Sequence, residues 1–212
     1  MSLKQEIAAN LLAAKAVSLR PDQPFTWASG IKSPIYCDNR LILSYPDKRD
    51  VVVKGFVSAI RAQFPEAEML MGTATAGIPW AAMSAQELKL PMGYVRASNK
   101  NHGKENKIEG NCPAKTKVVI IEDLISTGGS VRDVIEARRA VGAEVLGVLA
   151  IFTYELPKAL QTFAELNCPF ATLSDYSELI KVALADQRIQ TSDLEKLKAW
   201  KQDPGDESWM NK

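Results

Sequence analysis

The chain has 212 residues, of which 46% are hydrophobic, and its formal net charge is +1. This length and composition predict one domain, residues 1–212, with a sizeable core. The near-neutral charge provides no field to attract nucleic acid, and no apolar run approaches the roughly 18 residues that span a bilayer, so we expect neither partner. The three cysteines are widely spaced without a CxxC pair, which is typical of reduced thiols in a cytoplasmic protein.

The first predicted element is a helix over residues 3–17, whose apolar face comprises Leu3, Ile7, Leu11, Ala14 and Val17. Residues 25–37 follow, with aromatic and β-branched side chains around Ser29 and Gly30. This pattern predicts a hairpin or a pair of short strands. Because it precedes the first strand of the main sheet, we expect residues 20–40 to contribute to a small cap, or hood. A purely structural hairpin is the alternative.

Strands and helices alternate through the rest of the chain. Ser44 can cap a helix that runs to about Phe64. The expected strands are 69–71, 92–95, 117–122, 144–151 and about 170–173, with helices ending near 89 and spanning 129–140, 157–166, 176–185 and 191–200. This alternation predicts an α/β fold with a doubly wound parallel sheet. The right-handed crossover rule places the loops that follow 69–71 and 117–122 on the same edge of that sheet.

Residues 96–110 form a polar segment between two predicted strands, rich in Asn and Gly and containing the only histidine, His102. Its four cations are Arg96, Lys100, Lys104 and Lys107. A long polar loop in a compact domain is either a functional lid or a solvated connection. Its position beside a phosphate site and its positive charge favour a mobile catalytic loop that binds a polyphosphate.

The most informative stretch runs from Val118 to Ser130, with the sequence VVIIEDLISTGGS. Four β-branched residues predict a buried strand, and Glu122 and Asp123 follow where that strand should end. The loop with Gly128 and Gly129 exposes backbone N–H groups at the start of a helix, which suits a phosphate. Two carboxylates suit vicinal ribose hydroxyls or a ligand-held metal, so a ribose phosphate is predicted. An ordinary strand-to-helix turn is the alternative; neither GxxxxGK[ST] nor GxGxxG is present.

This pattern resembles the phosphoribosyl pyrophosphate (PRPP) signature of type I phosphoribosyltransferases. The hairpin FTxxSGxxSP and the loop RxxxKxHG make the chain, over about residues 3–185, similar to bacterial-type orotate phosphoribosyltransferases. The resemblance implies transfer of ribose 5-phosphate from PRPP to orotate, which gives orotidine 5'-monophosphate and pyrophosphate in de novo pyrimidine synthesis. It also implies Mg²⁺ held mainly by PRPP and water, and a homodimer with shared active sites.

Carried over by position, the resemblance implies catalytic roles for Lys100, His102 and Asp123. The implied PRPP-binding residues are Arg96, Lys100, His102, Glu122, Asp123, Leu124, Ile125, Ser126, Thr127, Gly128, Gly129 and Ser130. Ser126 would also contact orotate, the backbone of 72–76 would face the pyrophosphate, and no side chain is expected to be a dedicated metal ligand.

The chain departs from the family pattern at several positions. Some relatives carry Lys where this chain has Ala28, Ala76 and Ala97, and some carry an orotate-binding Arg in the segment that here is 152–155. The partner of the orotate carboxylate is therefore open, with Lys32 and hood backbone amides as candidates. Two alternatives remain: a purine-salvage phosphoribosyltransferase, and a PRPP-sensing regulator, which would need a basic nucleic-acid surface.

Overall fold

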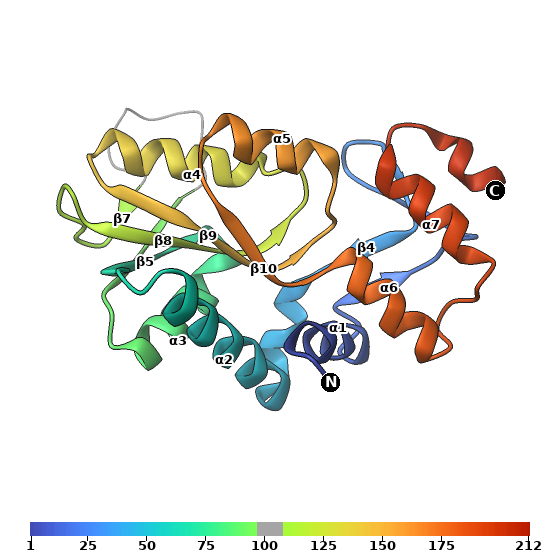
Figure 1. Ribbon diagram of the computed structural model, residues 1–212, viewed down its shortest axis with the longest axis horizontal. Coiled ribbons are helices and arrows are strands. Elements are labelled where there is room, and N and C mark those ends of the chain that lie inside the picture. Colours follow the sequence, from blue (N-terminus) through green and yellow to red (C-terminus); the bar gives the residue numbers. More distant parts are fainter. Residues whose placement is uncertain (97–107) are drawn as a thin grey trace.

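A central sheet of six strands organises the protein, seen here in a computed structural model that describes residues 1–96 and 108–212 (Figure 1). The strands, in sheet order, are β10 (Phe170–Asp175), β9 (Glu144–Thr153), β8 (Lys117–Ile125), β5 (Met69–Thr73), β6 (Met92–Val95) and β7 (Ile108–Glu109). Neighbouring strands pair in parallel, except that β6 and β7 are antiparallel. The predicted α/β fold with a mostly parallel sheet is confirmed.

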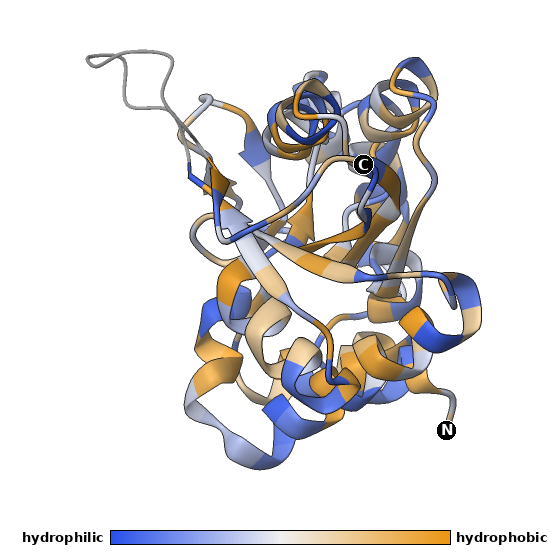
Figure 2. Cartoon of the chain, turned by 90° about the vertical axis from the view of Figure 1, so that its left-hand side faces the viewer, coloured by the Kyte–Doolittle hydropathy of each residue, from blue (hydrophilic) through white to orange (hydrophobic). Residues whose placement is uncertain are grey.

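Helices cover both faces of the sheet. One face carries α1 (Leu3–Ala13), α2 (Pro46–Gln63) and α3 (Gly77–Leu88), and the other carries α4 (Gly129–Ala140) and α5 (Pro157–Glu165) (Figure 1). The β8 side chains divide between the two cores: Val119 and Ile121 pack with the first set of helices, and Val118 and Ile120 with the second. Both faces of the strand are thus buried, which explains its unbroken apolar run, and Figure 2 shows hydrophobic strands between the helical layers.

Two small sheets lie beside the main sheet, in the region expected to contribute to the hood, and are called the hood below. In one, β1 (Val17–Leu19) pairs antiparallel with β4 (Ile35–Cys37), and in the other β2 (Phe25–Thr26) pairs with β3 (Lys32–Ser33). The 3-10 helix η1 (Asn39–Ser44) follows β4. At the chain's other end, α6 (Tyr176–Ala185), α7 (Asp193–Gln202) and the 3-10 helix η2 (Glu207–Asn211) complete the fold. The indole N–H of Trp200 in α7 donates to the carbonyl of Lys32 at 3.1 Å, which joins α7 to the hood.

Several predicted boundaries were wrong. The helix expected over 3–17 ends at Ala13, because Lys15 turns the backbone with a φ of 56° and Val17 begins β1. Ser44 does not cap α2: it is the last residue of η1, and Pro46 starts α2, where its fixed φ suits a first helical position. Strand β7 occupies the end of the segment expected to be one continuous loop.

The strands β8, β9 and β10 each extend two or three residues beyond their predicted ends, since pairing with neighbours continues there. The last helix, predicted over 191–200, spans Asp193–Gln202. Across the two described ranges, the structure contains no helix that combines the length and the apolar character needed to cross a membrane.

Candidate active site

The candidate site lies where β5 stops and β8 continues. Their pairing ends with Gly72 opposite Ile121, whereas β9 stays paired with β8 as far as Ile125 and Thr153. Glu122 and Asp123 therefore lie inside β8, and the prediction that they follow the strand's end was wrong. They nevertheless lie just past the point at which β5 leaves that edge of the strand uncovered. Ligands in parallel sheets bind at such carboxyl ends.

The two acids face different parts of the structure. Side chains alternate along a strand, so Glu122 follows Ile120 towards α4, and Asp123 follows Ile121 towards the hood. The Ser130 hydroxyl, in the first turn of α4, lies 3.5 Å from Glu122 Oε2. On the hood side, the Asn39 amide donates to the Asp123 carbonyl oxygen at 2.7 Å. The acid pair thus connects the start of α4 with the hood.

Burial governs the ionisation of this pair. Glu122 is 5% exposed, and desolvation, with a smaller contribution from the Asp123 carboxyl, raises its pKa from 4.5 to about 8. Desolvation likewise raises the pKa of Asp123, although the backbone N–H groups of Asp123 and Leu124 and the Arg40 charge oppose it. The pair therefore holds a proton near neutral pH. Groups that stabilise its charged form, such as hydroxyl donors or a cation, should displace that proton on binding.

The loop after β8 leads directly into α4. Gly128 has a φ of 80°, a left-handed conformation that favours glycine, and it caps the helix without a side-chain hydrogen bond. The first N–H groups of a helix have no intrahelical partners. Thr127, Gly129 and Ser130 are exposed around them. Residues 126–130 therefore lie at the positive end of α4, a position that suits the anion predicted there.

A second helix begins at the same edge. A Cβ atom on Gly77, the first residue of α3, would lie 2.3 Å from the Ile121 carbonyl oxygen and 2.5 Å from Thr73 Oγ1. Only glycine permits this approach between α3 and β8. Because β5 and β8 are parallel neighbours, the loop of residues 74–76 and the loop of 126–130 lie at one edge of the sheet, as predicted. The two loops can thus act on one ligand.

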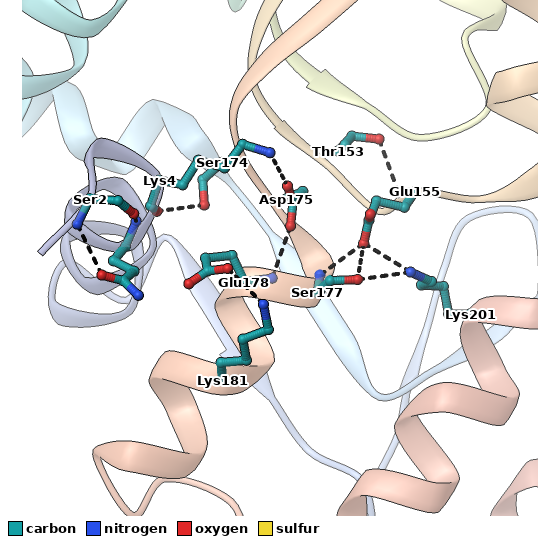
Figure 3. A network of polar contacts seen from close by, with 11 residues as sticks. Ser2, Lys4, Thr153, Glu155, Ser174, Asp175, Ser177, Glu178, Lys181 and Lys201 are labelled. Carbon is teal, nitrogen blue, oxygen red and sulfur yellow. Dashed lines mark hydrogen bonds and ion pairs between the residues drawn. The ribbon is translucent and has the colours of Figure 1, made fainter.

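The segment after β9 is fixed by aromatic and ionic contacts from α7. Tyr154 stacks on Trp27 of the hood with ring centroids 5.2 Å apart, and Trp200 lies edge-on to both rings. Glu155 accepts hydrogen bonds from the Lys201 ammonium at 3.0 Å and from the Ser177 backbone N–H at 2.9 Å (Figure 3). The segment 152–155 therefore has a structural role, and its one adjacent cation is already paired.

The structure brings together only part of the predicted site. The run from Glu122 to Ser130 connects the end of β8 directly with the start of α4. Arg96 lies at the end of β6, where its Nε is 3.1 Å from Glu109 Oε1. Lys100 and His102 lie outside the described residues, so their predicted roles stay predictions.

Sequence analysis missed three residues on the hood side: Asn39, Arg40 and Trp200. Asn39 is fully buried, and Arg40 follows it in η1. A usable signal was present, because the polar run Asp38-Asn39-Arg40 directly follows the aliphatic and aromatic strand β4. Trp200 gave no comparable signal, since a tryptophan on an amphipathic helix is typical of an ordinary core position.

The acid pair also limits how a metal could bind. Within residues 1–96 and 108–212, no three His, Cys, Asp or Glu side chains converge as a metal site. Glu122 and Asp123 provide at most two adjacent carboxylates. This set fits Mg²⁺, which is usually bound by one or two carboxylates together with waters and substrate phosphates.

Comparisons with known proteins agree with this geometry. The family described as "phosphoribosyl transferase domain" matches residues 43–170. An orotate phosphoribosyltransferase from Bacillus pumilus is 57% identical, covering 98% of this chain and 98% of the relative. One from Bacillus subtilis is 55% identical, covering 99% and 97%. Among solved structures, orotate phosphoribosyltransferase from Aeropyrum pernix is similar with a TM-score of 0.75 and 29% identity, covering 82% of this chain and 96% of that one.

Replacing Glu122 with Gln should stabilise the protein at high pH. The unfolded chain releases this proton near pH 4.5, whereas the folded chain keeps it to about pH 8. The free energy of unfolding therefore falls as the pH rises towards the raised pKa of Glu122. Gln does not titrate, so the variant should keep the stability that wild type loses. Thermal melts should show little difference at pH 5. At pH 9 the variant should melt at least about 2–4 °C higher, the shift expected for roughly 1 kcal/mol in a domain of this size.

The matched control is Glu136→Gln, an exposed carboxylate on α4 whose side chain is 60% accessible. Its melting temperature should differ from wild type by a similar small amount at both pH values. A Glu122→Gln effect that is the same at pH 5 and pH 9 would contradict the raised pKa.

Proposed function

The chain belongs to the orotate phosphoribosyltransferases, and from this we propose that it transfers ribose 5-phosphate from PRPP to orotate, giving orotidine 5'-monophosphate and pyrophosphate. The reaction is a step of de novo pyrimidine synthesis. One observation carries the proposal: an acid pair, the buried Glu122 and the half-buried Asp123, lies beside the backbone amides of residues 126–130 at one end of the sheet. That arrangement suits a ribose diol beside its 5'-phosphate, and the relatives favour orotate over the purine-salvage and regulatory alternatives.

The proposed mechanism follows from where charge develops. Breaking the bond between ribose C1 and pyrophosphate makes the sugar more positive and the leaving group more negative. Glu122 and Asp123 would accept hydrogen bonds from the ribose hydroxyls and favour the positive sugar, more strongly because burial lowers the local dielectric. The amides of 126–130 would hold the 5'-phosphate and fix the ribose for attack by orotate N1, with Ser126 positioned next to the base.

The leaving group needs positive charge of its own. Arg96, Lys100 and His102 are proposed to bind the pyrophosphate, and His102 could protonate it. The backbone of 72–76, which leads from β5 into α3, is proposed to face the pyrophosphate. Mg²⁺, when bound to PRPP, would add charge that stabilises the departing pyrophosphate. Closure of the segment 96–110 would exclude water that otherwise hydrolyses PRPP.

Three broader features are proposed with the reaction. Residues 20–40 would form the hood over the base, since Trp27 there packs on Tyr154 beside the acid pair. A homodimer would share its active sites, with segment 96–110 of one subunit reaching the other. The protein would act in the cytoplasm, consistent with Cys37, Cys112 and Cys168 all being free thiols.

The direct test is a product assay with PRPP, Mg²⁺ and four bases: orotate, uracil, adenine and hypoxanthine. We expect orotidine 5'-monophosphate from orotate and little or no product from the other three. Efficient turnover of a purine base in place of orotate would reject the proposed substrate while preserving the PRPP chemistry.

Asp123→Asn should reduce turnover with orotate without destabilising the fold. Loss of one electrostatic group at a reacting centre costs about 2–4 kcal/mol of transition-state stabilisation, or roughly 30- to 1,000-fold in rate. Because desolvation raises the pKa of Asp123, a neutral amide should not lower the melting temperature. Asp50→Asn on α2, where the side chain is 61% exposed, is the control and should keep wild-type kinetics. Turnover of the Asp123 variant within threefold of wild type would exclude the proposed role.

Shared active sites can be tested by mixing two inactive variants, Lys100→Ala and Asp123→Asn. If Lys100 acts in the neighbouring subunit, each mixed dimer has one site with both defects and one with neither. Random exchange makes half the dimers mixed, so activity should return to about a quarter of wild type for a two-fold symmetric dimer. If the loop acts within its own subunit, every site keeps a defect. Verified exchange without recovery would therefore refute the sharing.

A further inference from the structure

The structure identifies a cation suited to the carboxylate of orotate, an inference that rests on the proposed function. A carboxylate entering a partly enclosed site needs a cation or several N–H donors to replace its water. The segment 152–155 contains no Lys or Arg. Tyr154 packs against the ring of Trp27, and Glu155 forms an ion pair with Lys201. The candidate must come from elsewhere around the acid pair.

Arg40 lies at the junction between the hood and β8. It is the second residue of η1, immediately after Asn39, whose side-chain amide donates to the Asp123 carbonyl oxygen at 2.7 Å. This hydrogen bond holds the start of η1 against the catalytic end of β8. The pKa of Arg40 is raised chiefly by its hydrogen bond to Asp38, with a smaller contribution from the charge of Asp123.

The Arg40 guanidinium is held in one orientation. Its Nε donates to Asp38 Oδ1 at 2.7 Å and its Nη2 donates to Asp38 Oδ2 at 2.9 Å. These contacts use one edge of the planar fork. A guanidinium has five N–H groups, so the edge formed by Nη1 and Nη2 keeps two parallel donors for a second carboxylate. The side chain is 62% exposed, which leaves that edge accessible.

Two lysines are weaker candidates. Lys32 donates from its ammonium to Thr26 Oγ1 at 2.7 Å, within the β2–β3 hairpin. Lys201 donates to both Glu155 and Ser177. Both ammonium groups are therefore already occupied, one within the hood and the other between α7, Glu155 and Ser177. Arg40 instead follows Asn39, whose side chain binds the backbone of Asp123, the residue proposed to hold the ribose.

We propose that Arg40 binds the orotate carboxylate through its Nη1 and Nη2 edge, with Asp38 as the positioning residue that orients the guanidinium. Orotate would then lie between the hood and the acid pair, with its carboxylate towards η1 and its N1 towards the ribose. This arrangement would distinguish orotate from uracil, which lacks the carboxylate.

The test is steady-state kinetics of Arg40→Gln. Loss of hydrogen bonds between charged groups should raise the KM for orotate by roughly 10- to 100-fold. The KM for PRPP should stay within about twofold of wild type, a split that a merely structural role would not produce. The control Arg61→Gln removes an equally charged, exposed side chain at the end of α2 and should change neither constant.

Each result decides between named possibilities. If the wild-type protein forms no product from orotate, the proposed function itself is rejected. An active wild type with an unchanged orotate KM in Arg40→Gln overturns only the Arg40 assignment, as does an equal rise in both KM values. A selective rise in Lys32→Gln, with none in Arg40→Gln, would assign the carboxylate to Lys32 instead.

Discussion

The burial of Glu122 in β8, next to the half-buried Asp123, is the constraint on which the candidate site depends. Folding gains nothing from this burial, because removing Glu122 from water penalises its charged form and raises its pKa to about 8. The structure holds it there with local contacts, including the Asp123 backbone N–H, which donates to Glu122 Oε1 at 2.8 Å. An ionised carboxylate in this buried position interacts more strongly with nearby charges than one in solvent, because the local dielectric is lower. Burying the acid thus lowers the stability of the fold but strengthens its interaction with the sugar proposed to react there.

Close backbone packing keeps the phosphate loops in register with these acids. The approach of Gly77 to Ile121 fixes the start of α3 against β8, while continued pairing with β9 carries β8 two residues past Asp123. The glycine loop and α4 therefore begin from a rigid strand end, not from a free turn. A transfer reaction needs this precision, since an anion site displaced by even about 1 Å from the ribose loses much of its effect.

The parts of the structure that could be predicted are those encoded locally. Apolar periodicity identified most helices and every main-sheet strand except β7, and the glycine pair was correctly expected to begin a helix. Features set by a neighbour were missed: β8 ends where β9 stops pairing, and β1 is a strand only because β4 lies beside it. The same limit applied to the base side of the site. The hydrogen bond from Asn39 to Asp123 joins residues far apart in sequence, so no periodic pattern in the sequence could predict it.

The two ends of the chain meet around the proposed base site, outside the residues 43–170 that match the family model. Trp27 near the start packs edge-on to Trp200 near the end, and Lys4 pairs with Asp175 at 2.7 Å (Figure 3). The central residues hold features suited to any ribose phosphate donor, whereas the terminal residues belong to the proposed base site. Base selectivity can therefore change through the hood, η1 and α7 without altering the PRPP site. The hydrogen bond from Asn39 to Asp123 then joins the proposed base site to the strand that holds the acid pair.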